Sequence, residues 1–77
     1  MAKGVVKGSK VVSVRKAPWD PLCDVVVKEV KKGDTVVVDP NHTVYDWKGH
    51  EYYPFVSNRI QNGYIRKDAV QLTKKGG

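Results

Sequence analysis

Very few side chains in this sequence could take part in covalent or metal chemistry. The single cysteine, Cys23, would need a neighbouring base to become a thiolate nucleophile. The two histidines, His42 and His50, lie in turn-like segments far along the chain from it. They lack a further ligand at a recognisable metal-binding spacing, and the carboxylates are scattered among turns. The sequence therefore predicts a protein without catalytic residues, bound metal or cofactor.

An aromatic residue in a proline-rich loop is the better candidate, and the chemistry it indicates is binding. Trp19 lies between Pro18 and Pro21 and directly precedes Asp20. The prolines stiffen this loop, and an aromatic ring beside a carboxylate suits a cationic or proline-bearing partner. The alternative is that Trp19 folds back as a lid over one end of the domain.

Three further aromatic residues are candidates for the same surface. Trp47 is expected at a hairpin tip, where it would either contact a partner or pack across the strands. Tyr52 and its neighbour Tyr53 would point to opposite faces of a strand, so one is expected in the core and the other on the binding surface. Tyr64 would either pack or line the groove. The predicted binding residues are Trp19, Asp20, Trp47, Tyr52 and Tyr64.

The elements that must position these residues are strands. Valine occurs fifteen times, against two leucines and three alanines. Because β-branched side chains lose rotamer freedom in helices and pack well on sheets, this bias favours strands. No segment shows an apolar repeat of helical period and length. The sequence predicts one all-β domain, with turn signals at the spacing of a small barrel or sandwich.

Turn residues divide the chain into expected strands at 10–15, 24–30, 35–39, 43–47, 51–56 and 63–65, with one 3₁₀ turn at 66–70. The strands at 24–30 and 35–39 are predicted to pair as a hairpin. Pro54 is expected at an edge or bulge. We expect these residues to face inward: Val12, Val14, Val36, Val38, Val56 and Ile65.

Residues 1–8 are predicted to be a flexible tail, 9–72 the domain, and 73–77 a flexible basic tail. The net charge is +6, but the two tails carry four lysines, and residues 8–73 have ten basic and eight acidic side chains. This near balance weakens a nucleic-acid interpretation. The sequence shows neither a signal-peptide core nor a membrane-spanning run, so a cytoplasmic or virion-associated protein is expected if the start is native.

Four segments in order resemble the bacterial SH3-like (SH3b) domains. Val12-Ser13-Val14-Arg15 followed by Pro18 resembles the opening signature, with Ser13 in place of asparagine. The run from Val26 to Val38 about Lys32-Gly33 is similar to the family hairpin. Glu51-Tyr52-Tyr53-Pro54-Phe55-Val56 and Gly63-Tyr64-Ile65-Arg66-Lys67-Asp68-Ala69-Val70 resemble the two later motifs. The resemblance covers about residues 11–72 and implies an SH3-like barrel of five to seven short antiparallel strands.

The resemblance also implies a non-catalytic module that recognises peptides, often cell-wall peptides, through the long loop after the first strand. Two other functions remain open. The chain could be a structural or assembly protein, such as a phage or particle component, whose barrel edges and aromatic hairpin form contacts within an oligomer. It could also be a nucleic-acid-binding barrel that stacks bases on aromatic rings between basic residues.

Overall fold

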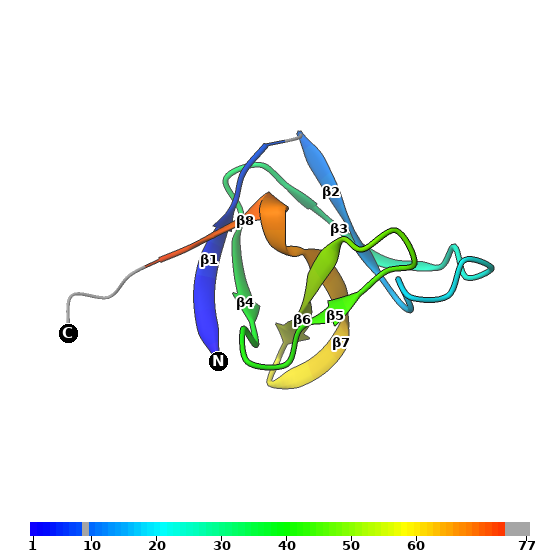
Figure 1. Ribbon diagram of the computed structural model, residues 1–77. Coiled ribbons are helices and arrows are strands. Elements are labelled where there is room, and N and C mark those ends of the chain that lie inside the picture. Colours follow the sequence, from blue (N-terminus) through cyan, green and yellow to red (C-terminus); the bar gives the residue numbers. More distant parts are fainter. Residues whose placement is uncertain (9, 74–77) are drawn as a thin grey trace.

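The computed structural model describes residues 1–8 and 10–73 and shows an all-β protein (Figure 1). One 3₁₀ turn near the C-terminus, η1, is the only helical element in these residues. No helix in this part of the chain is long and apolar enough to cross a membrane. The elements in chain order are β1 (Ala2–Val6), β2 (Val11–Arg15), β3 (Val26–Lys31), β4 (Thr35–Val38), β5 (Val44–Tyr45), β6 (Glu51–Ser57), β7 (Ile60–Arg66), η1 (Lys67–Ala69) and β8 (Val70–Leu72).

The eight strands form one antiparallel sheet that curves around a small core (Figure 1). The strand order is β3-β2-β7-β6-β4-β1-β8, and β5 pairs with β6 beside this path. The all-β class and the 3₁₀ turn are confirmed, and the sheet is barrel-like. It has one strand more than the upper end of the expected range, because the segment predicted to be the N-terminal tail is a strand.

The prediction of a flexible tail over residues 1–8 is wrong. β1 lies between β4 and β8 and pairs with both, and Val6 is only 1% exposed. Val6 also exchanges backbone hydrogen bonds with the turn before β4, accepting from Gly33 and donating to Asp34 at 2.9 Å each. Sequence reasoning missed this strand because it is short and its glycine interrupts the apolar pattern. At the other end, Thr73 donates to Lys3, and residues 74–77 of the predicted tail lie outside the described residues.

The predicted hairpin between 24–30 and 35–39 does not form. The turn at Lys31–Asp34 is present, with the Asp34 N–H donating to the Lys31 carbonyl at 2.9 Å. The strands diverge after it: β3 pairs with β2, whereas β4 pairs with β1 and β6. The turn residues therefore predicted correctly where the chain changes direction, but they did not predict which strands pair.

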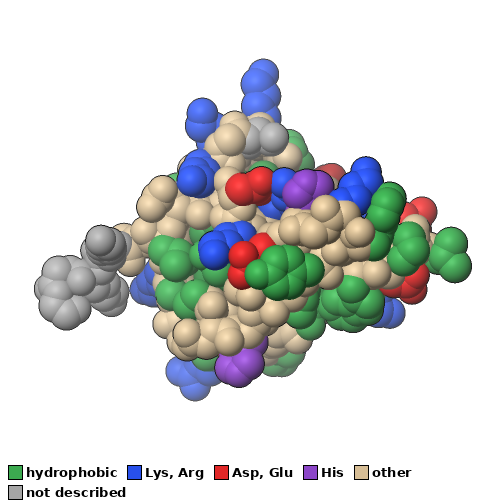
Figure 2. Space-filling model, in the orientation of Figure 1, with side chains coloured by type: hydrophobic (Ala, Val, Ile, Leu, Met, Phe, Trp, Pro, Cys, Tyr) green, Lys and Arg blue, Asp and Glu red, His purple; other side chains and the backbone are tan. Residues whose placement is uncertain are grey.

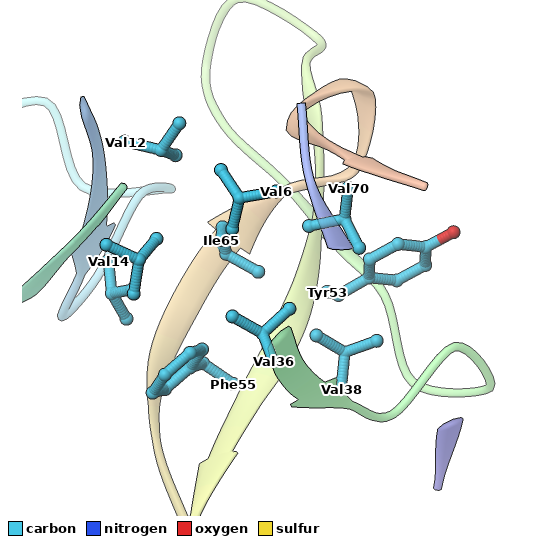
Figure 3. Packing of buried hydrophobic residues seen from close by; sticks show 10 residues of the cluster. Val6, Val12, Val14, Val36, Val38, Tyr53, Phe55, Ile65 and Val70 are labelled. Carbon is cyan, nitrogen blue, oxygen red and sulfur yellow. The ribbon is translucent and has the colours of Figure 1, made fainter. Parts of the chain in front are cut away.

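The core collects the inward positions of nearly every strand (Figure 3). Five of the six predicted core residues belong to it, all except Val56. Val56 is buried, but it pairs with Val37 on the opposite face of β6, and Phe55 takes the inward position. The register of β6 was therefore predicted one residue out. A bulge between Pro54 and Val56 lies where the proline was expected to interrupt regular pairing.

The segment at 57–62, between the expected strands at 51–56 and 63–65, contains a tight hairpin turn that joins β6 to β7. Its two turn residues, Asn58 and Arg59, have φ values of 53° and 64°. Successive positive φ values are typical of the two-residue turns whose twist matches the flanking strands. Arginine is an uncommon residue in this conformation, so the usual sequence signature of the turn is missing.

Candidate binding surface

One face of the β2–β7–β6 part of the sheet points away from the core. Arg15 of β2 pairs with Tyr64 of β7, and Arg66 of β7 pairs with Tyr52 of β6. Paired residues project from the same face, as do residues two positions apart on one strand. These four side chains therefore share one face, opposite the buried Ile65. We call it the outer face.

The β2–β3 loop (residues 16–25) and the β5–β6 turn (residues 46–50) enclose a groove of about 300 Å³ that reaches the outer face. We call it the loop groove. It brings together three of the predicted binding residues, Asp20, Trp47 and Tyr52. The side chains from the outer face that line it are Arg15, Tyr52 and Arg66.

Two successive turns shape the β2–β3 loop. The Asp20 N–H donates to the Ala17 carbonyl, and the Cys23 N–H donates to the Asp20 carbonyl, each at 3.1 Å. Pro18 and Pro21 occupy the second position of these turns, where the fixed φ of proline is favourable. The Asp20 carboxylate accepts a hydrogen bond from the Leu22 N–H at 2.9 Å. Asp20 is thus partly used in forming the loop, which leaves its second carboxylate oxygen for a partner.

Asp46 organises the opposite wall, and sequence reasoning did not select it. Its Oδ1 accepts hydrogen bonds from the N–H groups of Lys48 and His50 at 2.9 Å each. Its Oδ2 accepts from the Tyr52 hydroxyl and contacts His50 Nδ1, both at 3.1 Å. The signal that could have revealed it is an aspartate opening a short turn that contains glycine, since such carboxylates bond the following backbone amides.

These contacts shift the pKa values of the Asp46 carboxyl and the Tyr52 hydroxyl. Partial desolvation raises the pKa of Asp46, but hydrogen bonds from the His50 backbone and side chain, the Lys48 N–H and the Tyr52 hydroxyl outweigh it and lower the pKa to about 2. Burial and the hydrogen bond to Asp46 raise the pKa of the Tyr52 hydroxyl. Tyr52 is therefore held neutral beside a carboxylate, and its buried ring forms a rigid part of the groove.

Trp47 is the most exposed aromatic side chain on the loop groove, with 63% of its surface open to solvent. The Lys48 ammonium lies 4.9 Å from the centre of its ring. One face of Trp47 is therefore already occupied by a cation of the same chain. The positive charge of Lys48 disfavours a second cation at this ring, so the ring favours apolar or proline-bearing contacts.

Trp19 and Tyr64 form a second aromatic unit. Their ring centroids are 5.2 Å apart and the rings meet edge to face at 79°. Trp19 does not line the loop groove and does not belong to the buried core cluster, and 48% of its surface is exposed. Figure 2 shows further apolar side chains at the end of the molecule that carries the β2–β3 loop, where Leu22 is 92% exposed. The predicted site is thus divided between the groove and this aromatic pair.

A second groove, which sequence reasoning missed, lies on the other side of the outer-face arginines. It has a volume of about 520 Å³, and Lys7, Arg15 and Arg66 are the basic residues that line it. Asp68 is the one acidic residue in its lining, and it pairs with Arg66 through hydrogen bonds of 2.6 and 3.1 Å. We call it the basic groove. Lys7 was overlooked because it was assigned to a loose tail.

Four side chains that could bind a metal or act as a nucleophile or base line the loop groove: Asp20, Cys23, Asp46 and His50. Within residues 1–8 and 10–73, no three His, Cys, Asp or Glu side chains lie close enough together to hold a metal ion. The Cys23 thiol is half-buried at the edge of the loop groove. His42 pairs with Asp39 at 2.7 Å in a separate turn.

No family model, curated protein or solved structure matches this chain. The function is therefore inferred from the geometry of the two grooves and the outer face.

Proposed function

We propose that this domain is a non-catalytic binding module that recognises a peptide or protein segment on its outer face. The observation that carries the proposal is the loop groove, where an exposed Trp47 stands beside a proline-braced loop and a rigid Tyr52. Its volume of about 300 Å³ is at the lower end of the range typical of ligand sites. Exposed aromatic anchors on rigid supports are the usual origin of affinity in such sites.

The proposal includes a relationship to the SH3b domains. Each of the four resembling segments lies on a strand or turn of the sheet in chain order, which supports this relationship. The segment that resembles the family hairpin has the turn, but its two strands, β3 and β4, do not pair with each other. The opening motif lies on β2, the Lys32-Gly33 turn joins β3 to β4, the Tyr52-Tyr53 motif lies on β6, and the Gly63 motif runs along β7. In that family the corresponding surface binds peptides, which fits the position of the loop groove.

A random dodecapeptide library displayed on phage, panned against the immobilised domain, tests the proposal. We expect enriched peptides whose affinity falls by about 2 kcal/mol, roughly thirtyfold in Kd, in Trp47→Ala, because a central aromatic anchor is lost. Trp19→Ala is expected to weaken binding of peptides that reach the Trp19–Tyr64 pair. Tyr45→Ala is the matched control, since Tyr45 is exposed but lines neither groove. Failure to enrich any peptide, or peptides indifferent to both tryptophans, would contradict the proposal.

An assembly role is the second candidate, and it is favoured by a specific observation. β3 is an end strand of the sheet, and its first residue, Val26, is exposed together with the preceding Leu22 and Val25. An uncovered strand edge next to apolar side chains is a natural contact between subunits. Light scattering at increasing concentration distinguishes the two roles, because assembly predicts an oligomer of defined mass and a peptide-binding module predicts a monomer.

A further inference from the structure

The charges of the outer face indicate what kind of segment it binds. Because β1 belongs to the fold, Lys3 and Lys7 belong to it as well. Residues 1–73 then carry twelve basic and eight acidic side chains, so the charge of this part of the chain is +4 rather than near balance. The basic groove concentrates part of this excess, with three cations and one carboxylate in its lining.

The two arginines of the basic groove are not equally engaged. Arg66 donates to both oxygens of Asp68, from Nε at 3.1 Å and from an Nη at 2.6 Å. Among the described residues, no carboxylate lies within ion-pair distance of the Arg15 guanidinium. Arg15 is half-buried and lines the groove with its planar fork of donors unpaired in this part of the chain, and such a fork is the group best suited to hold a carboxylate by two parallel hydrogen bonds.

The basic groove and the loop groove adjoin. Arg15, Tyr52 and Arg66 line both of them, so a chain lying across these side chains reaches from one groove to the other. The floor of the basic groove includes apolar surface from Val11, Val12 and Ala69. A ligand with carboxylates near small apolar residues would match both the charge and the floor.

The other hollow beside Arg66 shares Lys7 and Arg66 with the basic groove, but Arg15 does not line it. Its volume is about 600 Å³, and it lies against the β5–β6 turn, η1 and β8. Across it, Lys67 and Glu51 already form an ion pair at 3.3 Å. It offers a partner no cation comparable to Arg15.

We propose that the segment recognised on the outer face is an acidic peptide, whose carboxylate is held by Arg15, with Arg66 and Lys7 beside it, while its neighbouring residues enter the loop groove. This inference rests on the proposed function. The partner it names is acidic, whereas the sequence around Trp19 and Asp20 suggested a cationic or proline-bearing partner. A nucleic-acid strand fits less well. Its continuous phosphates would meet Asp20 and Asp46 in the loop groove, and phosphate backbones are held by broader basic surfaces than this one.

The test uses the dodecapeptide library on the intact domain and on Arg15→Gln. We expect the wild-type domain to enrich peptides with net negative charge, and replacement of one glutamate or aspartate by its amide to weaken the best peptide about tenfold or more, since hydrogen bonds between charged groups are lost. Arg15→Gln should weaken the acidic peptide by a similar factor. It should no longer discriminate between the acid and the amide, which a merely structural effect would not produce.

Arg59→Gln is the matched control, because Arg59 lies in the β6–β7 turn and lines neither groove. Thermal melts of each variant confirm that the domain is folded. Enriched peptides that are neutral or cationic and bind Arg15→Gln unchanged would overturn the acidic-partner inference and leave the peptide-binding proposal standing, whereas no enrichment would remove both. A single-stranded oligonucleotide that binds more tightly than any acidic peptide, with affinity falling steeply between about 50 and 200 mM salt, would also overturn it.

Discussion

At the scale of single residues, the carboxylate of Asp46 explains how a short turn holds two parts of the groove in place. It binds two backbone amides of the β5–β6 turn and the hydroxyl of Tyr52, and its side chain is only 10% exposed. The ionised carboxylate accepts these bonds more strongly than the protonated acid, in which one oxygen becomes a donor. The same atoms therefore link the shape of the loop groove to the protonation of one group.

We predict that stability falls as the pH drops below 4, partly through Asp46. Its pKa is about 2 in the folded protein against an ordinary 3.8, so the stabilisation is present above the ordinary value and is lost as the pH falls towards 2. Melting temperatures of Asp46→Asn, measured across this range, should be lower near neutral pH and should decline less steeply than those of the wild type.

Part of the decline should remain in Asp46→Asn, because hydrogen bonds lower the pKa values of Asp39, Glu51 and Asp68 as well. Asp24→Asn is the control, since Asp24 is exposed and accepts no side-chain hydrogen bond from the described residues. An Asp46→Asn profile parallel to the wild type would show that the turn does not depend on this carboxylate.

At the scale of elements, β7 owes its position between β2 and β6 to a glycine. Gly63 has a φ of 90°, and a Cβ added there would lie 2.5 Å from a methyl group of Val27 and 2.7 Å from one of Val14. The absence of a side chain at Gly63 lets β7 approach Val14 of β2 closely. Gly63 is followed on the same strand by Tyr64 and Arg66, whose side chains lie on the outer face. The site therefore depends on a position with no side chain.

We predict that Gly63→Ala destabilises the domain by about 3 kcal/mol, because it adds steric overlap to the strain of a positive φ. Gly33→Ala is the matched control. Gly33 has a φ of 95° but open space around the added Cβ, so only the strain of about 1 kcal/mol should appear. Urea unfolding of both variants measures the difference. Equal losses would mean that β7 can move away from β2 and β3 at little cost.

The pairing of β3 and β4 shows why element positions were predicted better than element partners. The Lys-Lys-Gly-Asp turn is a local feature, and its hydrogen bonds form as its residues indicate. The choice of partner depends on which strand provides the edge that pairs with β4. β1 supplies it, and no residue between 24 and 39 carries that information.

At the scale of the whole molecule, β1 completes the sheet. It connects β4 to β8, and Val6 packs in the core with Val36 and Val70 (Figure 3). In so small a domain the total stability is expected to be only about 5 kcal/mol or somewhat more. The loss of one strand with two neighbours is therefore comparable with the whole free energy of unfolding.

We predict that deletion of residues 1–6 abolishes the cooperative thermal melt, because two strand ladders and the Val6 side chain are lost. A milder comparison keeps the chain intact. Val6→Ala should cost about 2 kcal/mol, whereas Val5→Ala, on the exposed face of the same strand, should change stability by about 0.5 kcal/mol or less. Circular dichroism during heating and urea unfolding measure these effects. A truncated protein with an unchanged melt would show that β1 is dispensable.

The sequence by itself determined the strand-forming character of the chain, most of its turns and most of its core. β-branched residues, prolines and glycines act through local backbone preferences, and alternation marks the inward side of a strand such as β2 or β4. It also identified aromatic residues that do reach the surface, including Trp19 and Trp47.

Only the tertiary structure decided that Ala2–Val6 is a strand, that β3 and β4 do not pair with each other, and that Phe55 rather than Val56 enters the core. It also placed Arg66 beside Lys7 and Arg15, which precede it by more than fifty residues, and it placed Asp20 but not Trp19 on the loop groove. The reason is that strand pairing and groove formation depend on contacts between distant segments. Their free energy comes from surface that only the complete fold can bury.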